Sequence, residues 1–100
     1  MAQHRLKTWP KPFTALWSGE KTFEIRNNDR GYAVGDRLVL QEFFPDSCMW
    51  GRRIVSADVA YILDGGFGLH EGYVCMALTN QTNEHDDDDD DDADDDERLE

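Results

Sequence analysis

Lys21, Glu24 and Arg26 are the charged residues of this chain whose types and spacing could do chemistry together. The segment around them alternates with a period of two, which places Phe23 and Ile25 on one face of a strand and Glu24 and Arg26 on the other. Glu24 and Arg26 would then project about 7 Å apart along the chain. Two cations and a carboxylate could bind a phosphate and the hydrogen-bonding edge of a base. The alternative is a solvated strand face with a weak ion pair.

A second candidate is the glycine-rich segment Gly65-Gly66-Phe67-Gly68-Leu69. Its glycines could let backbone N–H groups approach an anion, and Phe67 could stack on a base. The alternative is a connection between strands that needs positive φ angles, with Phe67 packed on the core. The segment is neither a P-loop nor a dinucleotide-binding fingerprint, so it is a weak phosphate motif.

Dispersed basic and aromatic residues could extend either site. Lys7, Arg30 and Arg52-Arg53 could form a basic rim, or they could simply solvate a neutral body. Trp50 stands in a predicted loop, where it could be exposed for base stacking or could cap one end of the fold.

Five short strands and one helix are predicted to position these residues. The strands are expected at residues 4–9, 21–26, 37–43, 52–63 and 73–78. Phe13, Leu16 and Trp17 form one apolar stripe of a helix over residues 11–18, with Gly19 suited to its C-terminal cap. We therefore predict a mainly β (α+β) domain with one or two short helices, folded as a small, mostly antiparallel barrel that closes its own edges. The expected buried residues are Phe23, Ile25, Val55, Val59 and Tyr61.

The candidate strand also resembles a known family. Gly19, Lys21, Glu24 and Arg26 match the G-x-K-x-x-E-x-R signature of ASCH domains, a branch of the PUA-like superfamily. Further segments resemble a subfamily of small ASCH-like proteins over about residues 4–78: HxLK from position 4, FEIRNNDR from position 23, VGD from position 34 and YILxGGFGL from position 61. The resemblance implies a small PUA-like β-barrel whose cleft, beside the signature strand, binds RNA or a nucleotide. The ligand-binding residues would be Lys21, Glu24, Arg26, Gly65, Gly66, Phe67 and Gly68.

An enzymatic alternative comes from the same resemblance. Some ASCH relatives are similar to this chain around Lys21 and hydrolyse an acetylated cytidine, which implies an amidohydrolase acting on a modified nucleoside such as N4-acetylcytidine. Lys21, Thr22 and Glu24 would then form the catalytic group. Glu24, however, stands where those hydrolases carry threonine, and a contact with Glu24 would keep the Lys21 amine charged when a nucleophile must be uncharged. We therefore expect a binding module that is non-catalytic or weakly catalytic.

Charge is concentrated at the C-terminal end. The formal net charge is −12, yet residues 1–83 carry nine acidic and nine basic residues. The body is therefore neither a globally acidic domain nor a nucleic-acid binder that works by bulk positive charge. We expect a folded domain at residues 1–79 and a disordered acidic tail at residues 80–100.

The tail offers a third function. Its run of aspartates could imitate a nucleic-acid backbone and occupy a basic protein partner, or it could be a solubilising appendage. The final Leu99-Glu100 is typical of residues that an expression vector adds.

Other features limit the remaining classes of function. No apolar run approaches the roughly 18 residues of a membrane span, and the N-terminus lacks the apolar core of a signal peptide, so we expect no membrane contact and a cytoplasmic location. Cys48 and Cys75 are expected to be reduced thiols. The three histidines lack ligand spacing, so we expect neither a metal nor a cofactor. A monomer is expected.

Overall fold

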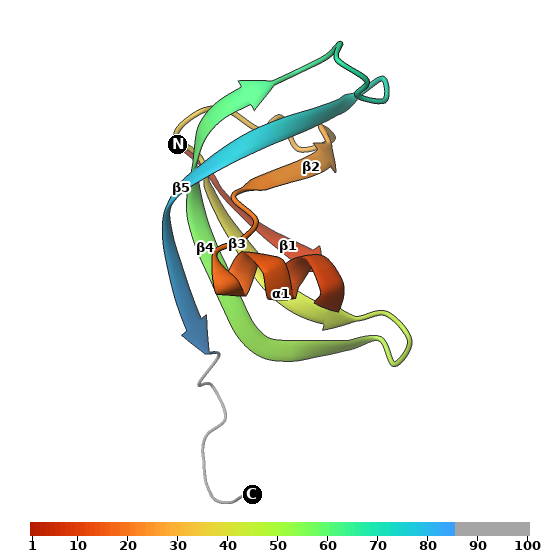
Figure 1. Ribbon diagram of the computed structural model, residues 1–100, viewed down its shortest axis with the longest axis vertical. Helices are drawn as coiled ribbons and strands as arrows, with labels where there is room; N and C mark the ends of the chain where they lie inside the picture. The colour runs from red at the N-terminus through yellow and green to blue at the C-terminus, as the bar shows by residue number, and fades with distance from the viewer. Residues whose placement is uncertain (86–100) are drawn as a thin grey trace, which may run out of the picture.

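A computed structural model of the chain describes residues 1–85 as one curled sheet with a helix on its concave side (Figure 1). The elements are β1 (Gln3–Thr8), α1 (Pro10–Ser18), β2 (Phe23–Asn27), β3 (Arg37–Phe44), β4 (Met49–Leu63) and β5 (Tyr73–His85). The strand order is β1-β3-β4-β5-β2, with β1 parallel to β3 and every other pair antiparallel. The predicted mainly β fold, with one short helix in the described residues, is confirmed.

The sheet forms a half-barrel whose edges are not joined by backbone pairing. β1 and β2 stand at the two ends of the strand order, and each pairs with one neighbour only. The three inner strands are paired on both sides, but the expectation that the barrel closes its own edges is wrong at this seam. What fills the seam decides where a ligand could enter.

The helix forms where the sequence predicted it. Pro10 and Pro12 occupy its first turn, where a missing N–H costs nothing. Gly19 ends it with φ of 86° and donates its N–H to the Leu16 carbonyl at 3.1 Å. Phe13 and Leu16 are fully buried against the sheet.

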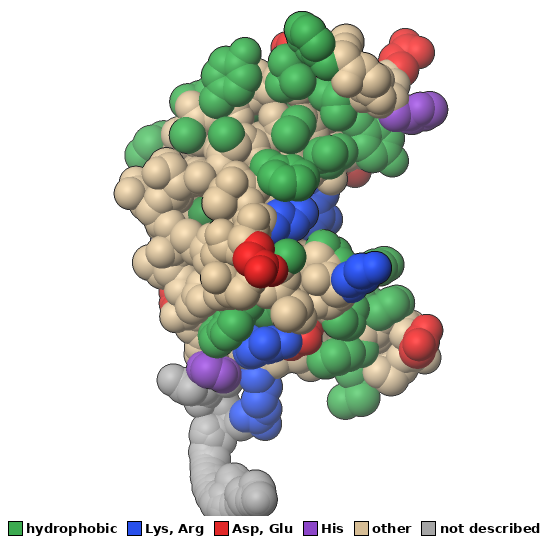
Figure 2. Space-filling view, in the orientation of Figure 1, with side chains coloured by type: hydrophobic (Ala, Val, Ile, Leu, Met, Phe, Trp, Pro, Cys, Tyr) green, Lys and Arg blue, Asp and Glu red, His purple; other side chains and the backbone are tan. Residues whose placement is uncertain are grey.

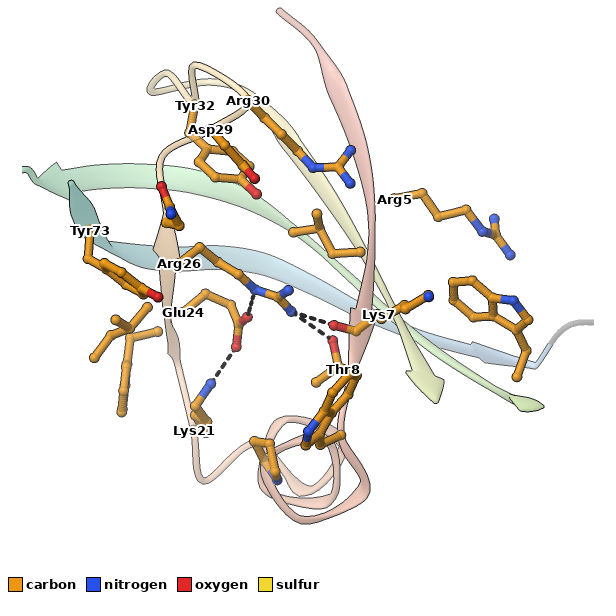
Figure 3. A pocket seen from close by; sticks show the side chains of 17 residues that line it. Arg5, Lys7, Thr8, Lys21, Glu24, Arg26, Asp29, Arg30, Tyr32 and Tyr73 are labelled. Carbon is orange, nitrogen blue, oxygen red and sulfur yellow. Dashed lines mark hydrogen bonds and ion pairs between the residues drawn. The ribbon is translucent and has the colours of Figure 1, made fainter. Parts of the chain in front are cut away.

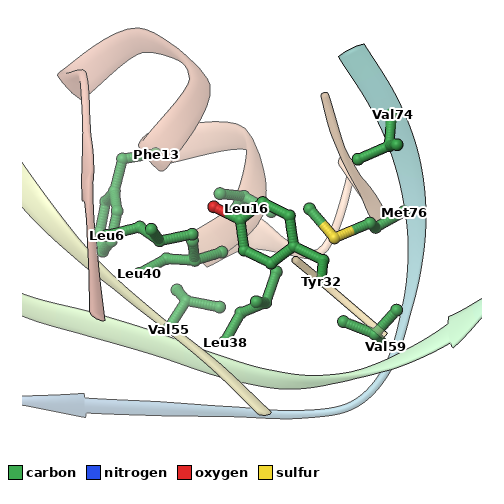
Figure 4. Packing of buried hydrophobic residues seen from close by; sticks show 10 residues of the cluster. All are labelled: Leu6, Phe13, Leu16, Tyr32, Leu38, Leu40, Val55, Val59, Val74 and Met76. Carbon is green, nitrogen blue, oxygen red and sulfur yellow. The ribbon is translucent and has the colours of Figure 1, made fainter. Parts of the chain in front are cut away.

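The core lies between α1 and the concave face of the sheet (Figure 4). Val55 and Val59 belong to it, as predicted. The other members of this cluster of buried residues are Leu6, Phe13, Leu16, Tyr32, Leu38, Leu40, Val74 and Met76.

The prediction that Phe23, Ile25 and Tyr61 are buried is wrong, because all three are exposed. Phe23 and Tyr61 both lie opposite Ala77 on the outer face of the sheet. Alternation along β2 shows that its two faces differ, but it does not say which of them turns inward. In β4, irregular register between Val59 and Tyr61 interrupts the alternation that would have kept Tyr61 inside.

The prediction that the chain is disordered from Asn80 is also wrong as far as His85, because β5 continues to that residue. Here polar side chains replace apolar burial. Gln81 donates its side-chain amide to the Leu16 carbonyl at 2.6 Å, and Asn83 donates to the Trp17 carbonyl at 2.8 Å. The carbonyls of a last helical turn lack their usual i+4 partners. The strand gives the Trp17 carbonyl a donor and adds a second donor to the Leu16 carbonyl, which already accepts from the Gly19 N–H. The rest of the predicted tail, residues 86–100, lies outside the described residues.

Two further expectations concern β4 and the thiols. β4 begins at Met49 rather than near residue 52, because a short turn at residues 45–48 replaces the longer predicted loop. Cys48 and Cys75 are free thiols, as predicted. Within residues 1–85, no helix has the length and apolar character that crossing a membrane would require.

Candidate functional site

The open seam between β1 and β2 contains a pocket of about 810 Å³. Its walls are the two unpaired strand edges, and residues of the β2–β3 connection and Trp50 complete it. Basic side chains show in the hollowed middle of the face in Figure 2, below a broad apolar area. The pocket therefore occupies the place where one more strand would have closed the barrel.

The backbone of β2 faces this pocket. Asn28 donates its N–H to the Gly72 carbonyl and Leu78 donates to the Thr22 carbonyl, both at 2.9 Å. Because the backbone groups of alternate residues point to opposite sides of an antiparallel strand, those of Phe23, Ile25 and Asn27 point away from β5. All three residues line the pocket. The free edge thus offers hydrogen-bond donors and acceptors whose direction is fixed by the sheet.

Lys21, Glu24 and Arg26 are brought together at the centre of the pocket (Figure 3). The Glu24 carboxylate is buried, with 4% of the residue exposed. One of its oxygens accepts a hydrogen bond from Lys21 Nζ, and the other accepts from Arg26 Nε at 2.7 Å. Burying a carboxylate is costly unless it is paired, and here two cations pair it.

Arg26 also joins the two edges of the half-barrel. Its Nη2 donates to the Lys7 carbonyl of β1 at 2.8 Å and to Thr8 Oγ1 at 3.2 Å. One arginine side chain therefore replaces the backbone ladder that is missing between β2 and β1. Its Nη1 has no partner among residues 1–85 and remains available to a ligand.

Two further cations of the pocket are free to bind an anion. Lys7 and Arg30 have no carboxylate within ion-pair distance in the described part of the chain. Arg5 is bound to the side-chain amide of Gln41. Burial raises the pKa of Tyr32, which outweighs the opposing effect of Arg26 and Arg30, so its hydroxyl stays a neutral donor at pH 7.

The glycine-rich loop is not part of this pocket. Residues 65–69 do not line it, and the side chain of Phe67 is 91% exposed at φ of 55°. The alternative in which Phe67 packs on the core is therefore wrong. Thr22 is exposed and does not line the pocket either, so the structure separates it from Lys21 and Glu24.

Three aromatic residues next to the pocket form a group that sequence reasoning recognised only in part. Trp50, for which the sequence left open both exposure and a capping position, is 46% exposed, and Trp9 is 49% exposed. The buried ring of Phe43 lies between them, with its centroid 5.3 Å from that of Trp50 and 5.6 Å from that of Trp9. Trp9 had no signal beyond its place before Pro10, and Phe43 was assigned only to a strand. Tyr32 and Tyr73 of the pocket were missed for the same reason.

No group of three or more His, Cys, Asp or Glu side chains is placed to hold a metal ion in residues 1–85. His4 Nε2 instead donates to the Asp36 carboxylate at 2.9 Å, away from the pocket.

Residues 3–78 match the family described as a domain of unknown function, DUF3850. The match includes every residue that lines the pocket. It also includes every element, apart from the end of β5. The chain therefore belongs to this family. No curated protein matches the sequence.

Proposed function

We propose that this member of the DUF3850 family is a binding module for RNA or nucleotides and that the ligand lies in the pocket between β1 and β2. The observation that carries the proposal is that one pocket joins unpaired cations with exposed aromatic rings. Phosphates bind guanidinium and ammonium groups, and bases stack on aromatic rings. The resemblance of residues 19–26 to ASCH domains supports the same ligand class.

The charge of the pocket supports an anionic ligand. Although residues 1–83 are formally neutral, five cationic residues line the pocket against two carboxylates, Glu24 and Asp29. The cationic residues are Arg5, Lys7, Lys21, Arg26 and Arg30. A local excess of positive charge in a concave surface attracts anions even where the whole domain does not.

The edge of β2 supports recognition of a base. The backbone groups of Ile25 and Asn27 point into the pocket, and Arg26, between them in the sequence, leaves its Nη1 without a partner among residues 1–85. A base could exchange hydrogen bonds with this edge while its phosphate contacts Arg26 or Arg30. Glu24 then acts as a positioning residue that holds Lys21 and Arg26.

Binding is favoured over amide hydrolysis by the contacts of Lys21. An ammonium nitrogen that donates to a carboxylate has no lone pair to offer as a nucleophile. Thr22, the second member of the hypothetical catalytic group, lies outside the pocket. We therefore expect no release of cytidine from N4-acetylcytidine beyond that of a Lys21→Ala control.

The proposal is tested by titrating ¹⁵N-labelled protein with nucleosides, nucleotides and short RNAs. The amides of Lys7, Ile25, Asn27 and Arg30 should shift together. Arg26→Ala should weaken binding by about 1.5–3 kcal/mol, the usual contribution of a charge-assisted hydrogen bond. Arg53→Ala is the matched control, because it also removes the arginine of a buried glutamate but lies outside the pocket. Unchanged affinity in a folded Arg26→Ala protein would contradict the proposal.

A further inference from the structure

The rings of Trp9, Phe43 and Trp50 form an aromatic platform at the β1 side of the pocket. Phe43 is buried and supports the other two rings, which are about half exposed. Phe43 lies opposite Trp50 in the β3–β4 hairpin, so the sheet fixes their relative position. Burial of Trp50 would be expected if it only capped the barrel, and nearly half of it remains open to solvent. Phe43 therefore holds the two exposed rings in place, and each of them keeps a free surface.

A free cation lies directly against this platform. Lys7 Nζ is 4.5 Å from the centroid of Phe43 and 5.9 Å from that of Trp50. No carboxylate of the described residues pairs with it. An exposed aromatic ring beside an unpaired cation suits a base together with its adjoining phosphate.

The platform and the Glu24 centre are on different sides of the Arg26 bridge. In Figure 3, Lys7 lies on the β1 side of Arg26, whereas Tyr73 lies on the β2 side. A single base cannot both stack on the platform beside Lys7 and contact the β2 edge. The guanidinium of Arg26 stands between the two places and donates to the Lys7 carbonyl at 2.8 Å. The pocket of about 810 Å³ lies in the upper part of the range found for small-ligand sites, and it extends to both sides of this bridge.

From these observations we infer that the ligand is single-stranded nucleic acid of at least two nucleotides, one base of which stacks on Trp50 while its phosphate contacts Lys7. This inference rests on the proposed function and adds to it a second base subsite. The first base lies on the β2 side of Arg26, and the strand passes the bridge to reach the platform.

Uridine 5′-monophosphate and oligouridylates of two and four nucleotides test the inference, because uridylates stack weakly on themselves. With the full chain, affinity should rise by at least about fivefold from the mononucleotide to the tetranucleotide, the effect of one base–aromatic stack. Trp50→Ala should remove that gain, so it should weaken the tetranucleotide more than the mononucleotide, whereas Trp50→Phe should keep part of the gain. Met49→Ala is the matched control, because Met49 is exposed on the same hairpin and has no ring.

The phosphate contact is tested by salt dependence. Lys7→Met keeps most of the apolar stem and removes the charge. For the tetranucleotide, the slope of log affinity against log salt should become less steep by about 0.7, the contribution of one phosphate contact on a single strand. The slope for the mononucleotide should change by less than the slope for the tetranucleotide.

The outcomes separate this inference from the proposed function. If the mononucleotide binds and the tetranucleotide binds no better, or if Trp50→Ala leaves the tetranucleotide affinity intact, the platform subsite is wrong and the pocket stands. If Trp50→Ala weakens both ligands equally while Trp50→Phe does not restore the difference, the platform supports the fold and the inference fails. If neither ligand binds the full chain, the proposed function itself is overturned.

Discussion

Two buried glutamates of this domain use the same chemistry for different ends. Glu24 is 4% exposed and Glu42 is 6% exposed, and each accepts a hydrogen bond from an arginine. Glu42 accepts both Arg53 Nη2 at 2.9 Å and Arg53 Nε at 3.1 Å. Glu24 shares its two oxygens between Lys21 and Arg26.

The surroundings of the two pairs differ. The Arg53 guanidinium lies 5.3 Å from the ring centroids of both Phe13 and Trp17, so the helix covers it. Gly51 faces Glu42 so closely that a Cβ there would be 2.9 Å from Glu42 Oε1. The side-chain hydrogen bond from Arg53 to Glu42 raises the pKa of Arg53, so the guanidinium stays protonated. The Glu42 pair therefore fills space between strands that are already paired.

The Glu24 pair, by contrast, lies where two strands are not paired by their backbones. Arg26 crosses from β2 to β1 and leaves open space on both sides of its side chain. In this fold, a buried ion pair that replaces backbone pairing marks a candidate binding site. A buried ion pair that is added to existing backbone pairing contributes to packing.

The largest expected effect is on stability when the charge of Glu24 is removed. Glu24→Gln leaves two cations without their carboxylate, and removing one partner of a buried pair costs about 3 kcal/mol. Glu42→Gln leaves only one partly exposed arginine, so we expect a loss of about 1.5 kcal/mol. Urea denaturation measures both, and Glu20→Gln, at an exposed position, should change little. A Glu42→Gln loss as large as that of Glu24→Gln would contradict the comparison.

A third carboxylate, Asp36, makes the stability of the domain depend on pH. It accepts hydrogen bonds from the Ala2 N–H at 2.9 Å, from His4 and from the Ala33 N–H at 3.0 Å. The Ala2 N–H contributes most and His4 next, and they lower the pKa of Asp36 to about 2.

Because the pKa of Asp36 is below its value of 3.8 in an unfolded chain, the unfolded state binds more protons between these limits. The stability due to Asp36 is therefore complete above about pH 4 and is lost as the pH falls towards 2. Melting temperatures measured from pH 5 to pH 2 should show this loss, and Asp36→Asn should make the profile flatter. A slope that Asp36→Asn leaves unchanged would assign the acid sensitivity to other carboxylates.

Much of the fold could be predicted from the sequence, because local signals fix it. Proline at the start of α1, Gly19 at its end and alternation along the strands located the elements. The direction in which β2 faces could not be predicted, because it depends on Arg26 reaching the Lys7 carbonyl and Thr8 across a seam that only the tertiary fold creates. Apolar residues were assumed to point inward, and in β2 the ion pair reverses that rule.

The site was predictable in its centre and not at its rim. The spacing of Lys21, Glu24 and Arg26 brought them together correctly, since all three lie on or beside one strand. The aromatic platform joins residues of β3, of β4 and of the junction between β1 and α1, so no local pattern could reveal it. The strand extension to His85 escaped prediction because its stabilising groups, Gln81 and Asn83, are polar and bind helix carbonyls.

The acidic C-terminal run should have a small effect on binding, and it follows the strand end near Arg53. His85 lies opposite Arg53 in the β4–β5 register, on the Glu42 side of the molecule. Ten aspartates follow between positions 86 and 96. Covalent attachment gives such a segment a local concentration near the millimolar range, so even a weak contact could compete for the pocket cations.

Removing residues 86–100 should therefore tighten binding of an anionic ligand. The cut belongs after His85, because Asn83 bonds to the Trp17 carbonyl and the His85 ring packs 5.4 Å from the Trp17 ring. We expect a gain of about twofold or more at 20 mM salt, and little gain near 1 M salt, where screening acts within about 3 Å. The melting temperature should hold, since β5 is kept whole. A full-length protein with the ten aspartates changed to asparagine is the matched control, and it should bind as the shortened chain does. Equal affinities of the full and shortened chains at 20 mM salt would reduce the acidic run to a solubilising role.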